Sequence, residues 1–255
     1  MIKKLGLQLY TIRDFMNDEE QIDESFAKLA ALGYSEAQTA GCKIDHVKFA
    51  ELAKKHGITI VGTHIGFDEI KNDPEGTMKL HKLWGTTNIG IGGMPGPARE
   101  SEESLKTFIK EFNESAELLN KHGFKLTYHN HSFEFRKVGK HTMMDMLADG
   151  LNPKTTSFVL DTYWVQHGGS DVRAWMEKLA GRIDILHLKD MGIKDANPPQ
   201  FITEILEGNI NFDGIIPLAE QIGVQYYCVE QDICPGNPFD SLKISADNIK
   251  ARYMK

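Results

Sequence analysis

The sequence predicts one (β/α)₈ barrel over residues 1–255, and three observations lead to this prediction. Short apolar runs typical of strands alternate along the chain with amphipathic runs typical of helices. No Pro/Gly/Ser-rich segment divides the 255 residues, and this length is usual for a single barrel domain. Several helical runs also end in a glycine directly before the next strand, as in the turns from helices into strands: Gly33, Gly57, Gly123 and Gly223.

The order of the expected elements follows from this alternation. Strands are expected at residues 5–9, 34–38, 58–64, 88–92, 125–129, 157–161, 183–188 and 226–230. Helices are expected at 21–32, 47–55, 101–121, 171–179 and 213–221, the last three starting at the N-cap candidates Ser101, Asp171 and Asp213. A doubly wound sheet is the alternative fold. It would be favoured by GxGxxG after the first strand, but that position holds the tetrapeptide QLYT.

Charge and cysteine content exclude several classes of protein. The formal net charge is -7 and no basic run occurs, which argues against a nucleic-acid partner. The three cysteines show no disulfide or zinc-finger spacing, so we expect free thiols in a reducing compartment. Neither a signal peptide nor a membrane span is evident, and we therefore expect a cytoplasmic protein.

Polar residues recur at the ends of the expected strands. Alternate strand residues face a barrel's interior, and active sites form at the carboxyl ends of the strands. With this period, Leu5, Leu7 and Leu9 face the helices and Gln8 faces inward. The last inward positions of five strands are His64, His129, Asp161, His187 and Glu230, and the inward positions before them include Gly62, Val159, Ile185 and Cys228. The convergence of titratable groups at one level of the barrel is the main functional signal.

Each of these residues also has a structural explanation. Asp161 could cap the turn after its strand, and His187 among aliphatic residues could be an ordinary core histidine. Glu230 is harder to explain, because an unpaired carboxylate inside a barrel is costly. Together the three offer nitrogen and oxygen ligands that suit Mn²⁺, Mg²⁺, Co²⁺ or Zn²⁺. The stretch YHNHSFEF at 128–135 could supply a fourth ligand from His129, His131 or Glu134.

Five motifs carry a family resemblance: GLQLYTIRD (6–14), YHNHSFEF (128–135), DTYW (161–164), HLKD (187–190) and VEQD (229–232). In this order they resemble the sugar phosphate isomerase/epimerase family of the xylose isomerase-like barrels, a superfamily that includes ketose 3-epimerases, inosose dehydratases and endonuclease IV. The resemblance covers essentially the whole chain. It is specific for the superfamily and much less so for the substrate.

The resemblance implies a divalent metal, most often Mn²⁺, held by Asp161, His187, Glu230 and a fourth ligand. Relatives with the HNHxxEF pattern imply Glu134 for the fourth position. The sequence departs from the family in two places. His129 stands where ketose epimerases carry glutamate, and Gln38 stands where many members have glutamate at the end of the second strand.

The activity implied by the resemblance is isomerisation or epimerisation of a ketose or keto-sugar, phosphorylated or not, through an enediolate. Glu134, Glu230, His129 and Lys189 are the expected catalytic residues, and Gln8, His64, His131 and Trp164 are the expected substrate contacts. A dehydratase or lyase, of the inosose dehydratase or keto-glycoside type, is the alternative, since only the fate of the enediolate differs. A non-catalytic sugar-binding barrel is the alternative of another class. The expected partner is a small sugar, and relatives of this kind often form homo-oligomers.

Overall fold

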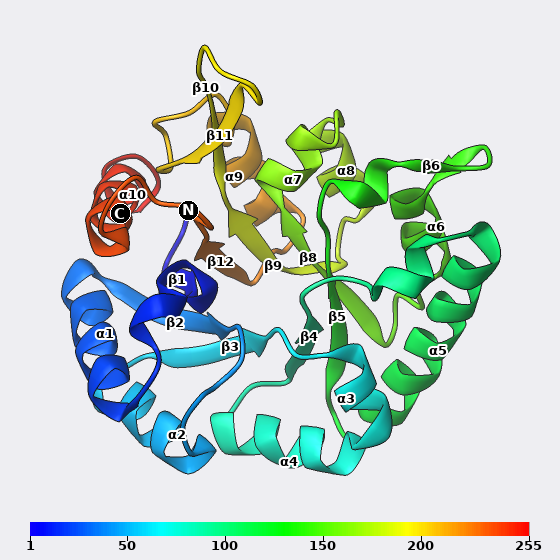
Figure 1. The fold of residues 1–255 in the computed structure, drawn as a ribbon, viewed down its shortest axis with the longest axis horizontal. Coiled ribbons are helices and arrows are strands. Elements are labelled where there is room, and N and C mark those ends of the chain that lie inside the picture. The colour runs from blue at the N-terminus through cyan, green and yellow to red at the C-terminus, as the bar shows by residue number, and fades with distance from the viewer. Residues whose placement is uncertain (255) are drawn as a thin grey trace.

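The barrel prediction is confirmed by the computed structural model, which describes residues 1–254; Lys255 lies outside the described residues. Eight parallel strands form one sheet surrounded by helices (Figure 1). The strands are β1 (Leu5–Gln8), β2 (Tyr34–Thr39), β3 (Thr59–Thr63), β4 (Asn88–Ile91), β5 (Lys125–His129), β8 (Thr156–Asp161), β9 (Ile183–Leu188) and β12 (Tyr226–Val229). Their order in the sheet is β3-β2-β1-β12-β9-β8-β5-β4, and a single bridge between Ile65 and Ile91 joins its two ends, so the barrel is nearly closed.

Helices cover the outside of this sheet. They are α1 (Glu19–Leu32), α2 (His46–Lys55), α3 (Phe67–Asn72), α4 (Pro74–Trp84), α5 (Glu102–Asn120), α6 (Met143–Gly150), α7 (Thr162–His167), α8 (Val172–Lys178), α9 (Phe212–Gln221) and α10 (Pro238–Tyr253), with 3₁₀ turns η1 (Leu9–Phe15), η2 (Gly96–Arg99) and η3 (Phe133–Phe135). None of these helices is long and apolar enough to cross a membrane.

Most expected boundaries agree with the structure to within about one or two residues. The cap of α9 and the end of the first strand need correction, and His64, Gly92 and Glu230 also lie one residue beyond their strands. Ser101 and Asp171 cap α5 and α8 as expected. Asp213 does not cap its helix, because the side chain of Asn211 accepts the hydrogen bond from the Gly214 N–H and α9 begins at Phe212. Leu9 is not in the first strand, which ends at Gln8 where η1 begins.

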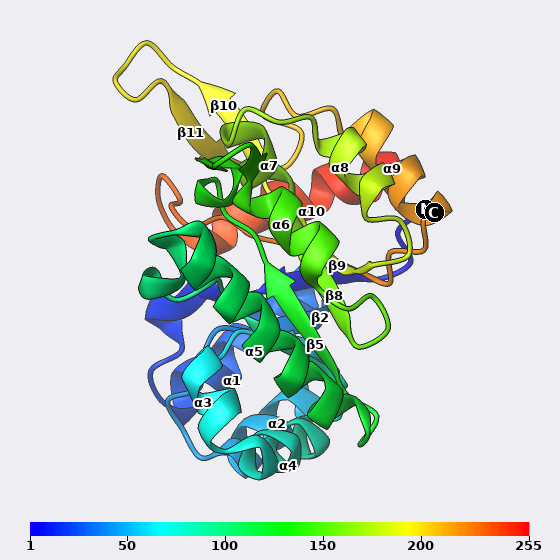
Figure 2. The same ribbon diagram turned by 90° about the vertical axis from the view of Figure 1, so that its right-hand side faces the viewer.

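Two hairpins outside the barrel were not predicted. One is β6 (Lys137–Val138) with β7 (His141–Thr142), and the other is β10 (Asp190–Ile193) with β11 (Gln200–Thr203). The second follows β9 and projects away from the barrel (Figure 2). Their strands are too short for an alternating pattern to identify them against the surrounding loops.

The barrel interior is filled as the period of two predicts. Val159, Ile185 and Cys228 form a small apolar cluster together with Val61. Gly62 also faces Ile185, since a Cβ placed on it would lie 2.8 Å from the Ile185 Cδ1 atom. Val61 and Gly62 are adjacent in β3, yet both face the interior, because the pairing of β2 with β3 skips Val61. All three cysteines are free thiols, as expected.

Asp190 anchors the segment that carries the β10–β11 hairpin. Its buried carboxylate accepts hydrogen bonds from the backbone N–H groups of Met191, Leu206, Gly208 and Ile210, at 2.7 to 3.1 Å. We expect Asp190→Ala to lower the free energy of unfolding by about 3 kcal/mol, because several buried donors lose their acceptor. Denaturant unfolding of the variant checks this. The same change at the exposed hairpin residue Asp195 should have little effect, and equal effects would contradict the anchoring role.

His81 links α4 to the barrel and makes stability depend on pH. Its Nδ1–H donates to the Thr77 carbonyl at 2.7 Å and its Nε2 accepts from the Thr63 hydroxyl at 2.8 Å, which requires the neutral ring. Burial lowers its pKa to about 4, below the unfolded value of 6.5. The stabilisation is therefore complete above pH 6.5 and is lost as the pH falls toward 4, by about 3 kcal/mol.

In His81→Gln we expect this loss between pH 6.5 and 4 to disappear, since glutamine does not titrate. Urea unfolding at a series of pH values measures the difference. The exposed His122→Gln serves as the matched control and should keep the wild-type pH dependence. An unchanged pH dependence in His81→Gln would rule out this role.

Candidate metal and active site

Four residues from neighbouring strands converge at the carboxyl end of the barrel: His129, Asp161, His187 and Glu230. They end β5 and β8, lie within β9, and follow β12, respectively. One potential ligand atom from each lies within 4.8 Å of those of the other three, and all four side chains are buried. Asp161, His187 and Glu230, which the sequence predicted to converge, therefore do lie together, and His129 is the fourth member of the group.

Both histidines are oriented by hydrogen bonds that leave one nitrogen facing the group. His187 Nε2–H donates to the Gln38 side-chain oxygen at 2.5 Å, and His129 Nδ1–H donates to the Gly92 carbonyl at 3.1 Å. His187 Nδ1 lies 3.0 Å from the Glu230 Oε2 atom and 3.6 Å from the Asp161 Oδ2 atom. His129 Nε2 also lies 3.6 Å from Asp161 Oδ2 and is buried without a hydrogen-bond partner in the described residues. Imidazoles held by an outer acceptor are the usual arrangement around a bound metal. The donor set of two nitrogens and two carboxylates thus fits a divalent ion such as Zn²⁺ or Mn²⁺.

The position of Asp161 is compatible with both of the roles considered for it. Its Oδ1 atom accepts the hydrogen bond from the Trp164 N–H at 2.9 Å and so caps α7, while Oδ2 faces the two histidines. Its own N–H donates to Asn130 Oδ1 at 2.9 Å, which ties the end of β8 to the loop after β5. The structural and the ligand explanation are therefore compatible.

Lys189 provides the positive charge among these acids. Its Nζ atom lies 2.9 Å from Asp232, 3.0 Å from Glu230 and 3.3 Å from Asp161, and the side chain is buried. Burial alone would lower the pKa of Lys189, but the three carboxylates raise it well above its usual value. For Glu230, burial alone would raise the pKa, but the nearby Lys189 and His187 outweigh the effect of burial and hold the pKa well below the ordinary range. Both groups are therefore ionised at neutral pH.

Glu134 lies outside the group, although we expected it to be a ligand. Its two oxygens accept hydrogen bonds from the Tyr128 hydroxyl and the His131 N–H, both at 2.8 Å. Tyr128 packs among Phe108, Phe112 and Phe158 on the helix side of β5, and η3 brings Glu134 to that same side. Burial raises the pKa of Glu134 to about 8. His129, which follows Tyr128 in β5, faces inward and is the member of the group where we had expected Glu134.

A cavity of about 360 Å³ opens above the four residues. It is lined by three of the expected substrate contacts, His64, His131 and Trp164, together with Lys189 and Glu230. Burial and the nearby His129 lower the pKa of His131 to about 3, and burial lowers that of His64 well below its usual value. Neutral imidazoles facing the cavity can exchange hydrogen bonds with hydroxyl groups.

Gln8 does not reach this cavity, although we expected it to contact the substrate. It is fully buried, and its Nε2 group donates to Gln38 Oε1 at 2.9 Å and lies 3.2 Å from His64 Nδ1. The hydrogen bonds from Gln8 and His187 to Gln38 therefore orient His187 from beneath. The glutamine at position 38, which departs from the family pattern, is well suited to accept from an imidazole N–H.

Asp232 was not singled out from the sequence. It lines the cavity, is partly exposed, and pairs with Lys189. Burial and the charge of Glu230 raise its pKa. Its position two residues after Glu230 in VEQD would have been the only signal, because it lies beyond the end of β12, where the alternation of a strand no longer applies.

Comparison with known proteins agrees with this architecture. The family model described as "xylose isomerase-like TIM barrel" matches residues 26–251. A sugar phosphate isomerase/epimerase from Parabacteroides distasonis superposes with a TM-score of 0.82 at 24% identity, covering 99% of this chain and 95% of that one. The IolI protein with a bound zinc atom superposes with a TM-score of 0.71 at 14% identity, covering 97% of each chain. These two similarities concern the fold.

One curated relative is an inosose dehydratase from Geobacillus thermodenitrificans, 26% identical over 156 residues. The match covers 55% of this chain and 52% of that enzyme, so the chain spans about half the length of this relative.

Proposed function

Because the chain belongs to the xylose isomerase-like TIM-barrel family, we propose that it is a metal-dependent isomerase or epimerase of a ketose or keto-sugar. The observation that carries the proposal is the buried group of His129, Asp161, His187 and Glu230, of which His129 and Glu230 line a cavity. A divalent ion held there, Mn²⁺ in our proposal, would act as a Lewis acid that polarises a carbonyl and stabilises the charge formed when the adjacent C–H proton leaves.

Three side chains are placed to move protons and charge. We assign Glu230 as the base that removes the proton beside the carbonyl, because it is ionised and lines the cavity. The Lys189 ammonium faces the negative charge that develops on the substrate oxygen. Asp232 returns the proton. The sequence predicted this role for Glu134, but the two oxygens of Glu134 accept hydrogen bonds from the Tyr128 hydroxyl and the His131 N–H.

The remaining cavity residues position the sugar. His64 and His131 are neutral and present imidazole edges to the hydroxyl groups. The indole of Trp164 offers an apolar face to sugar C–H groups. Gln8 and Gln38 act one layer below by holding His187 and His64.

The test is proton exchange with solvent. Protein loaded with Mn²⁺ is incubated in D₂O with a panel of ketoses and keto-sugars, with and without phosphate, and deuterium beside the carbonyl is followed by NMR. We expect exchange that Glu230→Gln abolishes, whereas the exposed Glu114→Gln on α5 leaves it unchanged. No exchange with any member of the panel, while a sugar still binds, would instead support a binding barrel.

A dehydratase is the second candidate, favoured by the partial match to inosose dehydratase. The same proton removal would then be followed by loss of a β-hydroxyl group, with Asp232 or Lys189 as the proton donor to the departing oxygen. Mass spectrometry of the product distinguishes the two outcomes. Loss of one water supports the dehydratase, and an unchanged mass supports the isomerase.

The proposal also covers the partner, the cellular location and the oligomeric state of the protein. We propose a small sugar as its partner rather than nucleic acid, in line with the net charge of -7. We also propose a cytoplasmic location, since Cys42, Cys228 and Cys234 are free thiols. Association into a homo-oligomer is a proposal from the family resemblance alone.

A further inference from the structure

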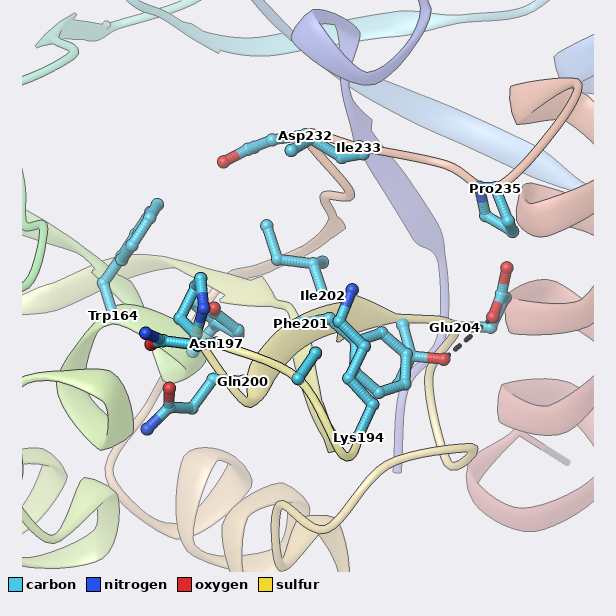
Figure 3. A pocket seen from close by; sticks show the side chains of 14 residues that line it. Trp164, Lys194, Asn197, Gln200, Phe201, Ile202, Glu204, Asp232, Ile233 and Pro235 are labelled. Atoms are coloured by element: carbon cyan, nitrogen blue, oxygen red, sulfur yellow. Dashed lines mark hydrogen bonds between the residues drawn. The ribbon is translucent and has the colours of Figure 1, made fainter.

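A second cavity, of about 530 Å³, lies between the β10–β11 hairpin and the loop after β12 (Figure 3). Its walls are mainly apolar and aromatic: Tyr163, Pro198, Phe201, Ile202, Ile233 and Pro235. We call it the hairpin cavity. Its size and lining are those of sites that bind a drug-sized apolar group.

The hairpin cavity adjoins the candidate active site. Trp164 and Asp232 line both cavities. In Figure 3 they lie at one end of the hairpin cavity, whereas Glu204 and Pro235 lie at the other. Trp164 and Asp232 therefore form the boundary that a molecule reaching from the four-residue group to the hairpin cavity would have to pass.

The two spaces differ in chemistry. Histidines, Lys189 and carboxylates line the first. The exposed surface of the second is mainly apolar, although Lys194, Asn197, Gln200, Thr203, Glu204 and Asp232 also line it. Ile233, which lines the hairpin cavity, is 73% exposed. A free sugar would fill only the polar space and leave this apolar surface in water.

We propose that the substrate is a sugar carrying an aromatic group, so that the sugar occupies the polar cavity and the aromatic group occupies the hairpin cavity. This inference rests on the proposed function for the identity of the sugar part. It narrows the substrate class from keto-sugars in general to aryl glycosides of keto-sugars. The hairpin, held in place by Asp190, is then the element that determines specificity.

Direct binding tests this without turnover. Calorimetry compares methyl and 4-nitrophenyl glycosides of several unoxidised sugars, which are probes without the reactive carbonyl, on the Mn²⁺-loaded protein. We expect at least one 4-nitrophenyl glycoside to bind roughly tenfold or more tightly than its methyl counterpart, because an aromatic ring is buried. If no aryl glycoside is preferred, including the case in which none binds, the proposal is overturned.

Matched variants test whether the preference for aryl over methyl glycosides arises in the hairpin cavity. Ile202→Asn and Ile233→Asn each place an amide in the hairpin cavity and should reduce the aryl preference several-fold. Ile233 is exposed, so its variant tests the proposal even if Ile202→Asn folds poorly. The control is Ile193→Asn on the same hairpin, where the side chain is 58% exposed and does not line the cavity. An equal loss in Ile193→Asn would contradict the assignment.

The two proposals fail in different ways. If no proton exchange is seen but 4-nitrophenyl glycosides still bind more tightly than methyl glycosides, the isomerase proposal is rejected and the hairpin cavity remains a ligand site. Exchange on free keto-sugars without any aryl preference would keep the isomerase and reject the hairpin cavity.

Discussion

Asp161→Asn is expected to remove the metal and the activity together. The asparagine keeps an oxygen to cap α7 at the Trp164 N–H but loses the charge that faces His129 and His187. Metal affinity should fall by roughly a hundredfold or more. Proton exchange should fall by roughly a thousandfold, because the charge formed on the substrate loses its stabilisation. Elemental mass spectrometry of protein purified without chelator or metal-affinity resin measures the metal directly.

The control for this variant is Asp171→Asn, which changes the cap of α8 at an exposed position away from the cavity. It should bind about one metal ion per chain, as the wild type should. If the wild type holds no Mn, Co, Fe or Zn even after incubation with Mn²⁺, the buried acids have only a structural role. A metal retained equally in Asp161→Asn would remove Asp161 from the ligand set.

Lys189→Met is expected to destabilise the metal-free protein strongly and to make its stability depend on metal. The change leaves Asp161, Glu230 and Asp232 close together without the buried ammonium that pairs with all three. Loss of one partner from a buried ion pair costs about 3–5 kcal/mol. Mn²⁺ at a hundredfold excess over its dissociation constant should restore about 2.7 kcal/mol, because it binds only the folded state. Thermal unfolding with and without Mn²⁺ measures both effects.

A surface lysine gives the comparison. Lys178 pairs with Asp145 and Asp149 but is 39% exposed, so Lys178→Met should change stability by less than about 1 kcal/mol. Its response to Mn²⁺ should equal that of the wild type. If Mn²⁺ leaves the stability of both Lys189→Met and Lys178→Met unchanged, the carboxylates around Lys189 do not hold the ion.

Alternation and turn residues were enough to predict the barrel from the sequence. Each of the eight strands lies within about one residue of its expected position, because apolar runs between glycine turns determine them locally. The inward direction of Asp161, His187 and Glu230 followed from the same period of two. Asp213 and Leu9 were misplaced at element ends, where the hydrogen bonds of Asn211 and the start of η1 decide the boundary.

The tertiary structure alone decided between His129 and Glu134. Both residues belong to YHNHSFEF, but β5 directs His129 inward, whereas η3 turns the chain so that Glu134 reaches the Tyr128 hydroxyl. The direction of a side chain beyond a strand depends on loop geometry and on distant packing partners, which no local pattern encodes.

The sequence by itself therefore determined the barrel, the level at which titratable groups gather, and three members of the candidate metal site. The tertiary structure decided the fourth member, the support of His187 by Gln38, and the hairpin cavity beside Trp164. The reason is physical: strand periodicity acts between neighbours in the chain, whereas these last features arise from contacts between residues far apart in it.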